Sequence, residues 1–220
     1  MHINGIVAVC KNGGIGLNNK LPWILQTDLQ RFKKTTIGNG NNAIIMGRNT
    51  WDSIPFLNGR DHLILSKTIN IDECKNNKLL KSFDSIDEVM KHCKERKYDK
   101  IWVIGGSNIY NQFIKLNLLN FLFVTYIEDD YECDVFFPKI PNNYFIVEKV
   151  VLNEYTERNK NSALIVYKQA KKNMHVLHKD SKWIIIDIHY DNYPEYYFTI
   201  RNINDTTHEK QTTPDKIKLL

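Results

Sequence analysis

The chain has 220 residues, a formal net charge of +5, 42% hydrophobic residues and 25% charged residues. This length exceeds the commonest size of one domain, about 100 to 150 residues, and therefore predicts one full domain plus a smaller one. No apolar run approaches the ~18 residues of a membrane span, so we expect no membrane contact. The modest charge without a basic block argues against a nucleic-acid surface, but leaves room for a cleft that attracts small anions.

The N-terminus and the cysteines favour a reducing, cytoplasmic location. Met1 leads directly into an apolar run at residues 3–9, without the basic segment or cleavage site of a secretory leader. The cysteines have neither the spacing of a zinc motif nor the density of a disulfide scaffold, so we expect four reduced, structural thiols at Cys10, Cys74, Cys93 and Cys133. The seven histidines show no metal-binding spacing, and we expect surface or packing roles for them and no metal site.

The first ~170 residues alternate between strand-like and helix-like stretches, which is the pattern of an α/β sheet protein. We expect strands at residues 3–10, 42–46, 62–66, 100–104, 121–127 and 163–168. Ser85 followed by Glu88 forms a capping-box pattern ahead of an apolar helical stripe at residues 86–93. Thr27 and Asn108 are predicted to begin two further helices.

Beyond this region the composition changes. Residues 168–180 are basic and polar with no clear period, and we predict a first domain at 1–170, a linker at 171–181 and a module at 182–220. Short strands are expected at residues 183–188, 196–201 and 209–213. The aromatic residues of this segment predict a small folded module of β hairpins rather than a disordered tail. Its role stays open between binding a protein partner, contact between copies of the chain, and a stabilising flap.

Asp28 is the acidic residue with the most informative surroundings. Its neighbours in the sequence include Trp23, Leu25, Leu29 and Phe32. A carboxylate in apolar surroundings is a candidate proton partner, or an anchor for a cationic or amidine-like group. An acidic residue in the first turn of a helix is, however, also favoured by the helix dipole alone. Position by itself leaves both interpretations open.

Gly105-Gly106-Ser107 follows an apolar strand and precedes a helix, where backbone N–H groups can meet a phosphate. The segment lacks the full dinucleotide fingerprint G-x-G-x-x-G, so an ordinary tight turn is an equal alternative. Arg48, Arg60 and Lys67 each follow or end a strand, and each could be a solvated charge. None of these positions decides a function alone.

Taken together and in order, these segments resemble dihydrofolate reductase along residues 3–170. The family's first strand and mobile active-site loop are similar to Ile6-Val7-Ala8-Val9, Gly14-Ile15-Gly16 and Leu21-Pro22-Trp23. Asp28 and Phe32 fall where the family has its acid and its pteridine-stacking aromatic residue. Residues 45–54 resemble the strand and helix with which the family binds its cofactor. Residues 59–66 resemble the region with which the family binds the substrate tail and the 2′-phosphate. Ile104-Gly105-Gly106-Ser107, Tyr110 and Thr125 complete the set, and six segments in the right order are far more specific than any one of them.

The resemblance implies an α/β fold with a mixed, mostly parallel central sheet flanked by helices, to which our own interpretation adds the small all-β C-terminal module. It also implies NADPH-dependent reduction of dihydrofolate to tetrahydrofolate, by hydride transfer to C6 and protonation at N5, in support of one-carbon metabolism and thymidylate and purine synthesis. The implied catalytic residues are Asp28, Trp23, Leu21 and Thr125. The implied folate-binding residues are Asp28, Phe32, Ile54, Leu57, Arg60 and Thr125. The implied NADPH-binding residues are Ala8, Ile15, Gly16, Gly47, Arg48, Asn49, Thr50, Ser66, Lys67, Gly105, Gly106, Ser107, Asn108, Ile109 and Tyr110.

In the family the Gly-Gly bond is cis, so the resemblance also implies a cis peptide at Gly105-Gly106. The main alternative is a reductase of the same fold that acts on a pyrimidine intermediate of riboflavin synthesis. Pro22-Trp23, Asp28 and Gly59-Arg60 argue against that alternative. A catalytically silent binding protein on this scaffold is disfavoured, because no expected active-site residue is missing.

Overall fold

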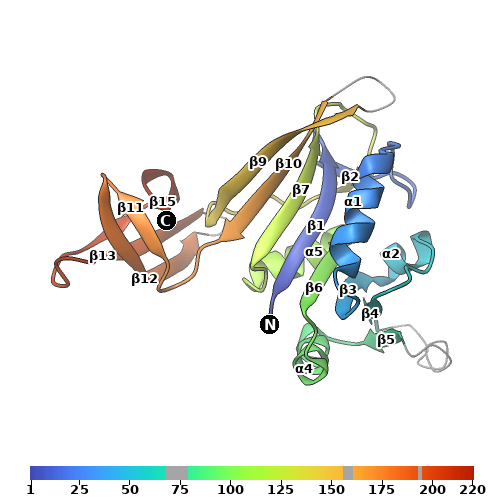
Figure 1. Cartoon of the computed structure of the whole chain (residues 1–220), viewed down its shortest axis with the longest axis horizontal. Helices are drawn as coiled ribbons and strands as arrows, with labels where there is room; N and C mark the ends of the chain where they lie inside the picture. The colour runs from blue at the N-terminus through green and yellow to red at the C-terminus, as the bar shows by residue number, and fades with distance from the viewer. Residues whose placement is uncertain (68–78, 156–160, 193–194) are drawn as a thin grey trace. The chain divides into compact units, whose positions relative to one another are not determined.

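The computed structural model describes residues 1–67, 79–155, 161–192 and 195–220 (Figure 1). The chain divides into two compact units. The first unit contains residues 1–138 and 149–165, and the second contains residues 139–148 and 166–220.

A central eight-stranded sheet has the order β5-β4-β3-β6-β1-β7-β10-β9. Its strands are β1 Ile3–Cys10, β3 Asn42–Gly47, β4 Asp61–Leu65, β5 Leu80–Phe83, β6 Lys100–Gly105, β7 Phe121–Ile127, β9 Tyr144–Tyr155 and β10 Asn161–Gln169. The neighbours from β5 through β7 pair in parallel. The inner strands carry continuous apolar runs, such as Ile44, Ile45 and Met46, because helices and loops cover both faces of a parallel sheet. The mostly parallel α/β fold predicted from the sequence is confirmed, with the expected strands in place to within two residues.

Four helices belong to the first unit in the part of the chain that the structure describes: α1 Gln26–Ile37, α2 Arg48–Ser53, α4 Ile86–Arg96 and α5 Ser107–Lys115. The predicted cap of α4 is confirmed, since the Ser85 side chain accepts the backbone N–H of Glu88 at 3.3 Å. The prediction that Thr27 caps α1 is wrong, because the helix already begins at Gln26, behind a buried Leu25 that has no side-chain cap bond. Helix α5 also begins one residue before Asn108. No described helix is both long enough and apolar enough to cross a membrane.

A short antiparallel ribbon, which the sequence did not reveal, joins β2 Gly14–Gly16 to β8 Val135–Phe136. Three-residue and two-residue strands are too short to show a hydrophobic period. The ribbon places the glycine-rich segment after β1 beside a distant loop.

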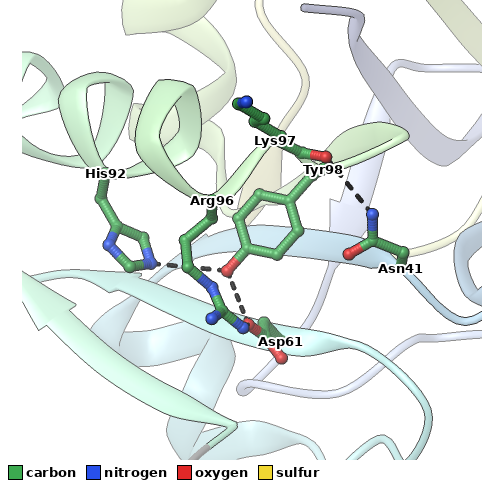
Figure 2. A network of polar contacts seen from close by, with 6 residues as sticks. All are labelled: Asn41, Asp61, His92, Arg96, Lys97 and Tyr98. Carbon is green, nitrogen blue, oxygen red and sulfur yellow. Dashed lines mark hydrogen bonds and ion pairs between the residues drawn. The ribbon is translucent and has the colours of Figure 1, made fainter.

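Figure 2 shows a polar network that ties the end of α4 to the start of β4. The hydroxyl of Tyr98 donates to Asp61 Oδ2 at 2.6 Å, and Arg96 pairs with the same oxygen at 3.3 Å. Burial, followed by the hydrogen bond to Asp61, raises the pKa of the Tyr98 phenol, so it remains a protonated donor. The network thereby fixes Asp61, the chain neighbour of Arg60.

Three of the four cysteines, Cys10, Cys93 and Cys133, are free thiols, as expected, and Cys74 lies outside the described residues. Burial raises the pKa of Cys93 to about 12 and that of Cys133 to about 11. Because the thiolate is the reactive form, both are unreactive thiols near neutral pH.

The second unit contains a five-stranded antiparallel sheet with the order β14-β13-β12-β11-β15. The strands are β11 His175–His178, β12 Ser181–Asn192, β13 Glu195–Asn202, β14 Glu209–Thr212 and β15 Lys218–Leu219, with a 3-10 turn at Pro214–Lys216. Its core is built around Val176, Trp183, Phe198 and Ile200. The small all-β module predicted at the C-terminus is therefore confirmed.

Strand β11 lies within residues 171–181, which we had expected to form a linker. Only two of its four residues, Val176 and His178, are buried, so the strand leaves almost no hydrophobic signal in the sequence. Contacts also group residues 139–148 and 166–170 with the C-terminal segment. The domain limits that we proposed at residues 170 and 182 remain a prediction.

Candidate functional site

Most of the predicted site residues on the sheet lie at one edge, at or beyond the carboxyl ends of its parallel strands. Arg60 is an exception: we expected it to follow or end a strand, and it instead directly precedes β4. Ala8 on β1 lies opposite Thr125 on β7, and Met46 on β3 lies opposite Gly105 on β6. Ser66 follows the end of β4. Because parallel strands end at the same edge, five segments far apart in sequence meet there.

The Asp28 carboxylate lies in the first turn of α1, with 15% of its side chain exposed. The hydroxyl of Thr125 donates to Asp28 Oδ1 at 2.6 Å, across 97 positions of the sequence. No residue in the described part of the chain donates a hydrogen bond to Oδ2. The two residues predicted to act together on the pterin ring are thus in direct contact, and one carboxylate oxygen is open.

Arg31 is a part of this site that sequence reasoning missed. Its Nη2 donates to Asp28 Oδ1 at 2.8 Å and lies 3.5 Å from Thr125 Oγ1. The signal that would have revealed it is the i,i+3 spacing from Asp28, which places two side chains on the same face of a helix.

Arg60 lies in the interior with only 3% of its surface exposed. Its Nη1 donates to Thr36 Oγ1 at 2.6 Å and to the Lys33 carbonyl at 3.2 Å, and its guanidinium lies 5.7 Å from the ring centre of Phe32. Burial lowers the pKa of Arg60. The Nε atom is buried and has no hydrogen-bond partner among the described residues. A buried donor without an acceptor costs free energy, and a carboxylate is the kind of group that could supply the missing acceptor.

His62 supports the loop that carries Leu57, a role beyond the packing that we expected of it. Its fully buried ring stacks on Phe56 at 4.3 Å, and its Nε2 accepts the backbone N–H of Leu57 at 3.1 Å. Burial, followed by the charge of Arg60, lowers the pKa of His62 to about 4. The ring is therefore neutral near neutral pH. Ile54 and Leu57 are half-buried against a core cluster formed by Ile44, Met46, Ile64, Leu80 and Trp102.

The segment of residues 21–23 is anchored at one end. Trp23 is only 4% exposed and meets Tyr131 edge-on at 5.4 Å, whereas 50% of Leu21 is exposed. Ile15 and Gly16 lie on β2 in the adjacent ribbon. Trp23 packs in a core cluster with Cys10, Leu25, Ile127 and Tyr131, whereas Leu21 is not part of this cluster.

The Gly105-Gly106 peptide bond is cis, as predicted. Gly105 has φ +112°, and a Cβ there would lie 2.8 Å from Tyr110 Cε2, so glycine is required at this position. The Tyr110 hydroxyl donates to the Ile6 carbonyl at 2.7 Å and holds α5 against β1. Helix α5 begins at Ser107, directly after the glycines. The backbone N–H groups of Ser107 and Asn108 lie in its first turn, where a helix provides no carbonyl acceptor for them.

The predicted phosphate-binding residues lie on α2 and after β4. Asn49 and Thr50 belong to α2, and Gly47 is its N-cap. The Arg48 Nε pairs with Asp52 Oδ2 at 2.6 Å on an exposed face of that helix, so its charge is partly compensated. Lys67 is exposed, and the residues directly after it lie outside the described part of the chain.

The dihydrofolate reductase family model matches residues 2–172 of this chain. The dihydrofolate reductase of Heliothis virescens is 34% identical over 179 residues, which cover 76% of this chain and 97% of that relative. The enzyme of Buchnera aphidicola subsp. Baizongia pistaciae is 37% identical over 177 residues, with 78% and 99% covered. The enzyme of Bos taurus is 36% identical over 148 residues, with 63% and 79% covered.

Proposed function

Because the chain belongs to the dihydrofolate reductase family and is therefore an enzyme that reduces dihydrofolate to tetrahydrofolate, we propose that it uses NADPH and orients the pterin ring on Asp28. The observation that carries this proposal is the Asp28–Thr125 contact at the carboxyl edge of the sheet. In the cell the product would supply one-carbon metabolism, including thymidylate and purine synthesis.

Asp28 positions the ring through its hydrogen bonds. A dihydropterin presents two parallel donors, N3–H and the 2-amino group, and a carboxylate is the side chain that accepts both. Thr125 holds Oδ1 in place from the sheet, and Oδ2 is open to a ligand. The ring would then lie between Phe32 on α1 and the loop that carries Ile54 and Leu57.

Arg60 would bind the glutamate end of the folate. Its guanidinium is held from inside by Thr36 and the Lys33 carbonyl, and its buried Nε needs an acceptor. An α-carboxylate supplies two oxygens in the geometry of the guanidinium fork. The fit supports a substrate with a carboxylated tail over a bare pyrimidine.

The residues at the glycine turn fit a dinucleotide. Gly47 and Gly105 let α5 pack closely against the ends of β3 and β6, since a Cβ on Gly47 would lie 3.0 Å from Ile109 Cγ1 and one on Gly105 would lie 2.8 Å from Tyr110 Cε2. The α5 amides of Ser107 and Asn108 would meet the pyrophosphate. Arg48, Asn49, Ser66 and Lys67 would surround the 2′-phosphate, which favours NADPH over NADH. We assign the lining of the nicotinamide and pyrophosphate path to Ala8, Ile15, Gly16, Gly105, Gly106 and Tyr110, and we expect Thr50 and Ile109 also to bind the cofactor.

When bound, NADPH supplies a hydride to C6 of the pterin. The residues of the chain manage the proton and the solvent. Because Asp28 would be occupied by the N3–H and 2-amino donors of the ring, we assign the immediate proton delivery to water, with Asp28 stabilising the protonated ring. Leu21 is exposed beside the anchored Trp23, and we assign to it the role of closing over the site and excluding bulk water.

The second unit has no part in this chemistry. Every residue that we assign to folate or NADPH lies before residue 126, in the first unit. We propose that the C-terminal sheet stabilises the protein or contacts a protein partner. The cytoplasmic location stays a prediction.

The test is a comparison of initial rates with purified protein. We expect NADPH oxidation with dihydrofolate, a much lower rate with NADH, and none with the pyrimidine intermediate of riboflavin synthesis. Turnover of that pyrimidine but not of dihydrofolate would contradict the proposal, and equal kcat/KM for NADH and NADPH would refute the assignment of the phosphate-binding residues.

A further inference from the structure

The carboxylate proposed to bind the pterin already has a cationic partner. Arg31 Nη2 and Thr125 Oγ1 both donate to the same oxygen, Asp28 Oδ1, at 2.8 and 2.6 Å. The Arg31 side chain is 23% exposed and the Asp28 side chain 15%, so the pair is only partly screened by solvent. A ligand that binds Asp28 therefore meets a carboxylate whose negative charge is partly compensated by Arg31.

This arrangement affects two kinds of ligand differently. A neutral ring with N–H donors needs acceptor atoms, and Oδ2 is open to it. A ring that carries its proton on the edge that meets Asp28 depends on the negative charge of the carboxylate, and it is repelled by a guanidinium on the same carboxylate. Two unit charges a few ångströms apart near a protein surface change an equilibrium constant by about tenfold or more.

We propose that Arg31 is a specificity-determining residue, which makes the Asp28 site prefer neutral amino-oxo pterins over heterocycles that bind as cations. The proposal rests on the function proposed above, because it takes Asp28 as the ring-binding group. Of the two side chains in the described part of the chain that donate to Asp28, Arg31 carries a positive charge and Thr125 is neutral.

The experiment measures the binding of two matched rings to the full-length protein by tryptophan fluorescence quenching. Pterin carries an oxo group where diaminopteridine carries a second amino group, and the diamino ring is the stronger base. Arg31→Gln removes the charge but keeps a hydrogen-bond donor, and Arg31→Lys keeps the charge. Lys34→Gln is the matched control, since it removes one charge from an exposed position one turn further along α1.

We expect Arg31→Gln to tighten diaminopteridine about tenfold while the dissociation constant of pterin changes less than threefold. Arg31→Lys should retain most of the wild-type preference, and Lys34→Gln should bind both rings as the wild type does. The difference in diaminopteridine affinity between Arg31→Gln and the wild type should be smaller at high salt, because salt screens the repulsion that the substitution removes.

Equal shifts of both rings in Arg31→Gln would overturn the proposal, since they would indicate a general change in the site rather than a charge effect. The same gain in Lys34→Gln would also overturn it, because the effect would then belong to the net charge of α1. Failure of the function is seen separately: a wild-type protein without dihydrofolate turnover would refute the proposed reaction, whatever the two rings do.

Discussion

Arg60→Leu is the substitution that tests the folate-tail contact most cleanly. The structure places the Arg60 guanidinium in the interior, with Nη1 bound to Thr36 and Lys33 and with Nε unpaired. A charge-assisted contact with a carboxylate is worth roughly 1.5 to 3 kcal/mol. Because every 1.4 kcal/mol is tenfold in a binding constant, the KM for dihydrofolate should rise about tenfold to a hundredfold.

The kcat should change little, since the tail carboxylate is held alike in the ground state and the transition state. The assay is steady-state NADPH oxidation, with each variant first checked for an unchanged melting temperature. A 6-methyl-dihydropterin, which has no carboxylate, is the control substrate, and its KM should be nearly the same in wild type and variant. An unchanged KM for dihydrofolate, or an equal rise for both substrates, would refute the assignment of Arg60.

Three further predictions concern Thr36, His62 and Phe198. Thr36→Val removes the hydroxyl that orients Arg60, so the KM for dihydrofolate should rise about threefold to tenfold with kcat retained, and an unchanged KM would show that Thr36 does not position the guanidinium. His62 has a folded-state pKa near 4, so its contribution to stability is complete above pH ~6.5 and is lost as the pH falls towards 4. The loss in the free energy of unfolding is at most about 3 kcal/mol. In melting curves recorded between pH 7 and pH 4, His62→Gln should lose less stability than the wild type does, and an equal loss in both proteins would contradict this role of His62. Phe198→Ala should destabilise the second unit by about 3 to 5 kcal/mol, while kcat/KM of the folded protein stays within about threefold of wild type, and a larger kinetic loss would show that this unit helps to build the site.

The strands of the central sheet were predictable because each carries a strong local signal. Residues 42–46 form a short, mostly apolar run, and the structure buries all five of them in β3. The capping pattern at Ser85 was equally local and is confirmed. The start of α1 was not predictable in this way, since burial of Leu25 and not a side-chain cap precedes it.

The site was predictable only where the family resemblance supplied long-range information. No local pattern connects Asp28 with Thr125, which lie 97 positions apart and meet through the sheet. The partners of Arg60 and Leu57, namely Thr36 and His62, were missed for the same reason: a threonine or histidine in an apolar stretch has no signature of the residue that it will contact. Arg31 could have been found from its helical spacing to Asp28.

The central claim is that the Asp28 carboxylate orients the pterin and stabilises its protonated form. The most direct test is the turnover of Asp28→Asn with dihydrofolate and NADPH across a range of pH. Asparagine keeps the size of the side chain but presents one acceptor and one donor, so the amide repels one of the two ring donors. We predict a folded variant that binds NADPH normally, loses most of its turnover at neutral pH, and recovers part of it in acid, where solution supplies the proton to the substrate. Wild-type activity at every pH in this variant would contradict the account.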